Sequence, residues 1–131
     1  MIRSSKFVPA FFSALISLTA ATTVSAQQPG ISDTEIKFGN IMPYSGPASA
    51  LSVTGKEFAA YFDLVNEKGG VNGRKLNMIS LDDGFSPPKT VEATRRLVEN
   101  DGVAFMFGTM GTAPSSATAK YLNGAKVRIC S

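Results

Sequence analysis

VAFMF, residues 103–107, and GTMGTAPSS, residues 108–116, together decide the fold of this chain. The five apolar residues are typical of a strand that is buried on both faces of a sheet. The loop after them is rich in glycine and hydroxyl residues, and Pro114 is typical of the first turn of a helix. In open α/β sheets, ligands bind beyond the carboxyl ends of the strands, where free backbone N–H groups can hold an anion. The stretch therefore predicts a strand, a candidate anion-binding loop and a helix.

The first 26 residues have the order of a secretory signal peptide. Two basic residues precede an apolar run over residues 7–21, and the segment ends in Val24-Ser25-Ala26. A transmembrane anchor is the alternative, but this run is interrupted and shorter than the roughly 20 apolar residues that span a bilayer. The residue directly after Ala26 is not a cysteine, which disfavours a lipid-anchored protein. We therefore expect cleavage after Ala26, which leaves a mature domain over residues 27–131.

Charge and residue content exclude several kinds of site. Cleavage removes two of the 13 basic residues and none of the 10 acidic ones, so the mature net charge is +1. No basic block points to nucleic acid. The chain has no histidine, and its single cysteine is Cys130. A His-dependent catalytic triad, a metal site built from His or Cys, and a disulfide scaffold are therefore excluded within this chain.

The mature chain alternates short strands with helical patterns. We expect, in order, a strand at 35–42, a helix at 55–68, a strand at 75–81, a helix at 87–100, a strand at 103–107, a helix at 114–122 and the start of a fourth strand within 126–130. In the first helix, Phe58, Phe62 and Val65 form an apolar face that Ala59 and Leu64 widen. The order β-α-β-α-β-α predicts an α/β fold of parallel strands layered with helices.

Turn residues mark the ends of these elements. Gly69-Gly70 is typical of a left-handed cap that ends a helix. Asn72-Gly73 is typical of a tight turn. Ser86 followed by Pro87 is typical of the N-cap and first position of a helix.

Three segments of the mature chain are candidate ligand sites: the turn after the first expected strand, the pair Asp82-Asp83 and the loop from Gly108. The turn from Gly39 to Gly46 lacks the glycine spacing of a dinucleotide site, and Asp82-Asp83 as a ribose-binding acid is weaker than its interpretation as a solvated loop. The loop from Gly108 offers hydroxyl groups and helix-start amides that suit a carboxylate. The alternative is an ordinary capping loop, in which Thr112 or Ser116 only satisfies backbone groups.

Four segments, in order and spacing, match one family. They are Ile36–Met42 with Ser45-Gly46-Pro47, the Asn-x-x-Gly-Gly-x-x-Gly-x-x-Leu run from Asn66 to Leu76, Asp82-Asp83 followed by Pro88, and Val103–Phe107 with its hydroxyl loop. Over residues 31–127 the chain resembles the start of a periplasmic solute-binding protein of the branched-chain amino-acid (Leu/Ile/Val) group of ABC importers. These proteins have the type I periplasmic binding fold.

The resemblance implies a two-lobed periplasmic receptor, monomeric and without cofactor or catalysis, that closes on a small solute and delivers it to a membrane permease. In this family the loop after the third strand holds the ligand carboxylate. By position that role falls on Thr112, with Gly111 and Met110 beside it. Leu51 lies near a position where amino-acid-binding members often carry an aromatic residue, so related small carboxylates and amides also remain candidate ligands. Tyr44 is either a cleft residue or simply a turn residue.

The resemblance also implies a truncated N-terminal lobe, because the family's mature chains are much longer. Residues 128–131 depart from the family's usual continuation, and deleting one C from codons for Val-Pro-His-Leu-Leu yields Val-Arg-Ile-Cys-Ser. We therefore hypothesise that residues 128–131 are out of frame, which the nucleotide sequence beyond codon 127 tests. Without a fourth strand, Val103–Phe107 becomes an exposed edge. We then expect a marginally stable chain that binds ligand weakly or not at all.

Two other functions stay open. One is a ligand-sensing domain of the same fold coupled to a signalling partner, which genes for a kinase or cyclase beside this one would support. The other is a small secreted α/β enzyme that uses Asp82-Asp83 as an acid/base pair. The enzyme is disfavoured because adjacent residues of a strand point to opposite faces of a sheet.

Overall fold

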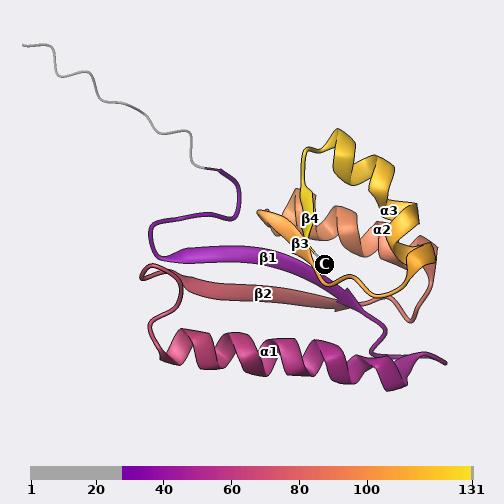
Figure 1. The fold of residues 1–131 in the computed structure, drawn as a ribbon. Helices are drawn as coiled ribbons and strands as arrows, with labels where there is room; N and C mark the ends of the chain where they lie inside the picture. The colour runs from indigo at the N-terminus through magenta and orange to yellow at the C-terminus, as the bar shows by residue number, and fades with distance from the viewer. Residues whose placement is uncertain (1–27, 131) are drawn as a thin grey trace, which may run out of the picture.

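The computed structural model describes residues 28–130, so the expected signal peptide lies outside the described residues. Four strands form one parallel sheet in the order β2-β1-β3-β4, with α1 on one face and α2 and α3 on the other (Figure 1). The elements are β1 (Glu35–Met42), the 3-10 helix η1 (Ser49–Leu51), α1 (Ser52–Glu67), β2 (Lys75–Asp82), α2 (Pro87–Arg95), the π-helical turn η2 (Arg96–Asn100), β3 (Phe105–Phe107), α3 (Thr112–Gly124) and β4 (Arg128–Cys130). The predicted α/β fold with parallel strands is confirmed.

The strands β1 and β2 form the long part of the sheet. They pair over their whole length, from Glu35 opposite Lys75 to Met42 opposite Asp82. The shorter β3 joins the other side of β1, where Met106 lies opposite Gly39. A Cβ atom at position 39 would lie 2.8 Å from Sδ of Met106, so a larger residue there would require the Met106 side chain to shift.

The expectation that Val103–Phe107 is an exposed edge is wrong. Residues 128–130 pair in parallel with β3, and the N–H of Gly108 donates to the carbonyl of Cys130 at 2.9 Å. The exposed edge on this side of the sheet is therefore β4, and β3 lies inside. The strand β3 is also shorter than predicted, because the N–H of Val103 bonds back to Leu97 of the preceding helical turn at 3.1 Å.

The main core lies between the sheet and the helices α2 and α3. Its buried members are Ile41, Ala93, Leu97, Val103, Met106 and Leu122. The predicted helical segment at 87–100 is confirmed in extent, but it changes type, from the α-helix α2 up to Arg95 to the π-helical turn η2 after it. This turn still buries Leu97 completely and leaves Arg95 and Arg96 exposed.

The opposite face of the sheet is aromatic. The ring of Phe38 stacks on Phe105 and meets Phe62 edge-on, with centroid distances of 5.1 and 5.0 Å. The predicted inner positions Phe58, Phe62 and Val65 of α1 are half-buried, as expected for a face that contacts the sheet.

The predicted widening of this helical face is wrong. Ala59 and Leu64 are exposed, Leu64 by 46%. Both lie one position from an inward-facing residue, and a step of one residue along a helix turns a side chain by about 100°. They therefore project away from the sheet.

The predicted turn signals fall where the chain turns. Gly69 and Gly70 have φ values of +99° and +73°, and the N–H of Gly70 bonds to Val65 at 2.9 Å, which confirms the cap at the end of α1. Asn72 and Gly73 also have positive φ, between the bridged residues Val71 and Arg74.

Candidate functional site

Three loops meet at the carboxyl edge of the sheet, one after each of β1, β2 and β3. The N–H of Met110 in the third loop donates to the carbonyl of Ile41 near the end of β1 at 3.4 Å. Gly46 of the first loop lies against Gly84 of the second, where a Cβ atom at position 46 would come within 3.2 Å of the Gly84 carbonyl oxygen. The parallel sheet thus brings these loops together at the edge where α/β folds bind ligands.

Asp82, at the end of β2, joins the first two loops. Its Oδ1 accepts the N–H groups of Ser45 at 3.1 Å and Gly84 at 2.9 Å, and its Oδ2 accepts the hydroxyl of Ser45. The Ser45 hydroxyl bond, followed by the Gly84 N–H bond, lowers the pKa of Asp82 from its ordinary value of 3.8. The carboxylate is therefore engaged in fixing the loops.

Asp83 has a different set of partners. Its buried carboxylate accepts the N–H of Phe85 at 2.9 Å and the hydroxyl of Thr90 at 2.7 Å. Thr90 belongs to the first turn and a half of α2, so the carboxylate lies at the start of that helix. Ser86 is the N-cap of α2 and Pro87 its first residue, as predicted, although the Ser86 side chain makes no capping hydrogen bond.

The start of α3 differs from that of α2 because its N-cap is a glycine rather than a serine. Gly111 is its N-cap with φ +96° and ψ +141°, a conformation that favours glycine, and no side-chain hydrogen bond caps the helix. The first N–H of the helix to bond back along the chain is that of Ser115, to the Gly111 carbonyl at 3.1 Å. Pro114, in the first turn, has no N–H to satisfy. Within residues 28–130 the capping bond expected of Thr112 or Ser116 in the alternative interpretation is absent.

Three of the five predicted site residues lie at the start of α3. Met110, Gly111 and Thr112 are consecutive at the start of α3, and Thr112 is its exposed first residue. Leu51 ends η1 and is 41% exposed.

Tyr44 takes part in an internal polar chain. Its hydroxyl lies 2.6 Å from Oγ of Ser80, which donates to Oδ1 of Asn40 at 2.6 Å. The amide of Asn40 in turn donates to the carbonyl of Phe107 at 2.8 Å. The Tyr44 hydroxyl also packs on α1, because a Cβ atom on Gly55 would lie 2.5 Å from it. This chain ties β1, β2 and β3 together below the loops.

Sequence reasoning missed Phe85 in the second loop. Its φ is +62°, its side chain is 41% exposed, and its ring lies against Gly111. The Asp83-Gly84 pair is a turn signal that marks the loop. Nothing in the sequence marks the aromatic residue, because its contact joins two loops that are distant along the chain.

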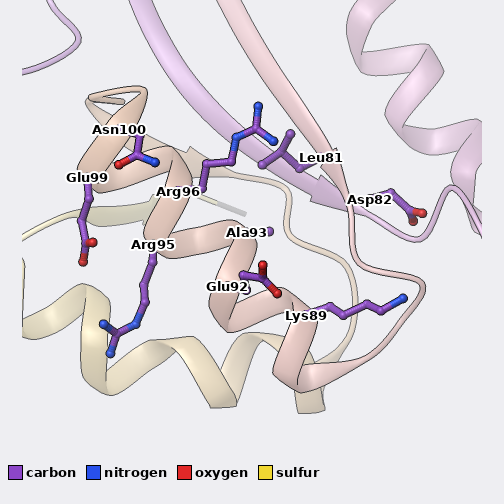
Figure 2. A pocket seen from close by; sticks show the side chains of 9 residues that line it. All are labelled: Leu81, Asp82, Lys89, Glu92, Ala93, Arg95, Arg96, Glu99 and Asn100. Atoms are coloured by element: carbon purple, nitrogen blue, oxygen red, sulfur yellow. The ribbon is translucent and has the colours of Figure 1, made fainter.

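A hollow of about 580 Å³ lies between the end of β2 and the helical segment formed by α2 and η2 (Figure 2). Most of its lining side chains are charged, with both signs present. The lining residues are Leu81, Asp82, Lys89, Glu92, Ala93, Arg95, Arg96, Glu99 and Asn100. None of the five predicted site residues is among them. Across residues 28–130, no helix has the length and apolar character needed to cross a bilayer.

Comparison with known proteins decides the family. Residues 35–130 match the family described as "Periplasmic binding protein". The chain belongs to this family. Its members are binding proteins, not enzymes. The Leu/Ile/Val-binding protein BraC3 of Rhizobium johnstonii is similar, with 33% identity over 102 residues that cover 76% of this chain and 28% of that protein.

Solved structures agree. A fatty acid ABC transporter substrate-binding protein from Thermomonospora curvata has a TM-score of 0.68 and 28% identity, covering 80% of this chain and 27% of that one. The branched-chain amino acid transporter protein LivJ from Streptococcus pneumoniae, solved with isoleucine, has a TM-score of 0.68 at 22% identity, covering 73% of this chain and 28% of that one. The latter likeness concerns the fold alone. The chain thus spans just over a quarter of the length of these relatives.

Proposed function

We propose that this chain is a solute-binding component of an ABC importer whose ligand carries a carboxylate, of the branched-chain amino-acid kind or a related small carboxylate or amide. The observation that carries the proposal is the uncapped start of α3, at the edge where the three loops meet. The names of the relatives, which include Leu/Ile/Val-binding and fatty acid substrate-binding proteins, support this ligand class.

The chemistry of the helix start suits an anion. Backbone N–H groups of a first helical turn point outward with a partial positive charge, and they bind a carboxylate without a counter-cation. In the proposed complex, the ligand carboxylate accepts the N–H groups of Thr112 and Ala113 and the hydroxyl of Thr112. Met110 and Gly111 shape the approach, and Tyr44 of the first loop and Leu51 of η1 border it.

The proposed setting is the periplasm, after removal of residues 1–26, with a membrane permease as the partner that receives the solute. Closure of two lobes on the solute would stabilise the closed, solute-bound form of the receptor, which the permease then recognises. In this proposal, the residues that the structure describes supply one wall of such a site. We therefore propose that this chain alone binds its ligand weakly.

Calorimetric titration of the purified mature chain with L-leucine and with hexanoate tests the proposal. Loss of a hydrogen bond to a charged group costs about 1.5–3 kcal/mol, so Thr112→Ala should weaken binding about tenfold or more. Ser116→Ala is the matched control, since it removes an exposed hydroxyl one turn further along the same helix. Equal affinities for the Thr112→Ala chain and the unaltered chain would contradict the assigned role of Thr112.

A further inference from the structure

Phe85 has an unusual backbone conformation for a bulky residue. Its φ of +62° lies in the left-handed region, which large side chains rarely adopt. It follows Gly84, with φ +56°, and the N–H of Ser86 bonds to the carbonyl of Asp83 at 3.0 Å. Residues 83–86 therefore form a tight turn in which both central residues have positive φ, as in a type I′ turn. Such conformations persist only where the surrounding structure imposes them, and they gather at functional sites.

The surrounding groups hold Phe85 from its backbone. Its N–H donates to the buried carboxylate of Asp83 at 2.9 Å, and Thr90 of α2 donates its hydroxyl to the other oxygen of that carboxylate at 2.7 Å. Asp83 is 1% exposed, so its position is fixed within the protein. The turn is thereby anchored to α2, and the direction of the Phe85 side chain is set.

The ring of Phe85 reaches the start of the next helix. A Cβ atom at Gly111 would lie 2.7 Å from Cε2 and 2.9 Å from Cζ of Phe85, so ring and glycine backbone are in close contact. Gly111 immediately precedes Thr112, the first residue of α3. The Phe85 side chain thus connects the loop after β2 with Gly111, the N-cap of α3.

We propose that Phe85 is a positioning residue of the ligand site, whose ring holds Gly111 and thereby fixes the backbone N–H groups at the start of α3. This inference rests on the proposed function and extends it to a residue to which the family resemblance assigned no role. Packing alone does not require this arrangement, because the side chain remains 41% exposed and its backbone is strained. A glycine at position 85 would adopt the same turn without strain but would leave Gly111 without its contact.

Two readouts on the mature chain test the proposal, with L-leucine as the probe. The first is the ¹⁵N order parameter of the Gly111, Thr112 and Ala113 amides without ligand, and the second is the dissociation constant for L-leucine. Phe85→Gly should lower the order parameters from the roughly 0.85 of rigid backbone toward 0.6. It should also weaken binding about tenfold, because misaligned donors lose charge-assisted hydrogen bonds. Phe85→Tyr keeps the ring and should restore both values.

Asn72→Gly is the matched control. Asn72 also has positive φ, at +52°, but it lies in the turn between α1 and β2, at the other end of β2. This variant should change neither readout, and comparison of thermal midpoints separates a loss of positioning from a loss of stability. Unchanged order parameters in the Phe85→Gly chain would overturn the proposal, whatever its affinity. Absence of L-leucine binding by the unaltered chain would count against the proposed function, while the order parameters would still decide the role of Phe85.

Discussion

Two helices start side by side at the carboxyl edge of this sheet. Within residues 28–130 neither has a side-chain cap, but the start of α2 has a buried carboxylate beside it and the start of α3 does not. At α2, the buried carboxylate of Asp83 bonds the hydroxyl of Thr90 and the N–H of Phe85. At α3, Gly111 is the N-cap, no side chain caps the helix, and the first turn contains no acidic residue. The start of α2 holds a carboxylate that belongs to the chain. The start of α3 has no such group, and its first two residues, Thr112 and Ala113, carry the N–H groups that Pro87 and Pro88 of α2 lack. For this reason we propose that the start of α3 takes the carboxylate of a ligand.

The largest expected effect follows from removing the internal carboxylate. Asp83→Ala removes the acceptor of the Phe85 N–H and leaves the buried Thr90 hydroxyl with the Ser86 carbonyl, at 2.9 Å, as its remaining acceptor. The loss of a buried hydrogen-bond partner costs about 1–3 kcal/mol, and the variant also leaves a cavity. We expect the free energy of unfolding, measured by urea denaturation, to fall by about 2–4 kcal/mol. Asp82→Ala, at an exposed carboxylate, should cost about 1 kcal/mol or less. Equal losses for the two variants would show that the start of α2 does not depend on its buried acid.

The second effect concerns the glycine that shapes the start of α3. Gly111→Ala places a Cβ atom against Phe85 and Pro114 at a φ of +96°, so we expect a loss of about 1–3 kcal/mol in unfolding free energy. Gly124→Ala, at the last residue of the same helix, meets no atom within 4 Å and should be neutral or slightly stabilising. A harmless Gly111→Ala would mean that the contact with Phe85 is loose.

A third variant makes the two starts alike. Thr112→Asp places a carboxylate at the open start of α3, where the helix dipole favours negative charge by about 0.3–1 kcal/mol at low salt. Thermal unfolding should therefore show a small stabilisation that salt reduces. The same variant should abolish binding of carboxylate ligands, because the site is filled and negatively charged. Undiminished binding by Thr112→Asp would place the ligand carboxylate elsewhere.

The smallest effect is a pH dependence at Asp82, which joins the first two loops. Its pKa is lowered in the folded state, so its hydrogen bonds stabilise the fold above the ordinary value of 3.8 and are lost as the pH falls through the lower folded value. Ser45→Ala removes the largest cause and should raise the pKa of Asp82 toward 3.8, as measured by NMR titration of its carboxyl carbon. An unchanged titration curve would indicate that Ser45 does not hold the carboxylate in solution.

Local chemistry explains which features were predictable from the sequence. Strand β1, the cap at Gly69-Gly70 and the turn at Asn72-Gly73 depend on neighbouring residues, and each was predicted where it occurs. The loop at 108–116 was recognised for the same reason. Its glycines and hydroxyl residues lie next to one another along the chain.

Features that depend on distant contacts were missed. The start of a fourth strand within 126–130 was predicted and is confirmed as β4, but its pairing with β3, which places β3 inside the sheet, was not foreseen. The exposure of Ala59 and Leu64 depends on how α1 is rotated over the sheet. Phe85 adopts its conformation through Asp83 and Gly111, which no periodicity reveals.

The most direct test of the central claim is a ¹H–¹⁵N NMR titration of the mature chain with L-leucine and, in parallel, with leucinol, which has the same side chain and no carboxylate. If the start of α3 is the carboxylate site, L-leucine should shift the Thr112 and Ala113 amides first and most, and leucinol should leave them in place. The amides at the start of α2, where Asp83 already lies, should not move with either compound. Shifts at Thr112 and Ala113 of equal size with leucinol, or shifts confined to other parts of the chain, would contradict the account.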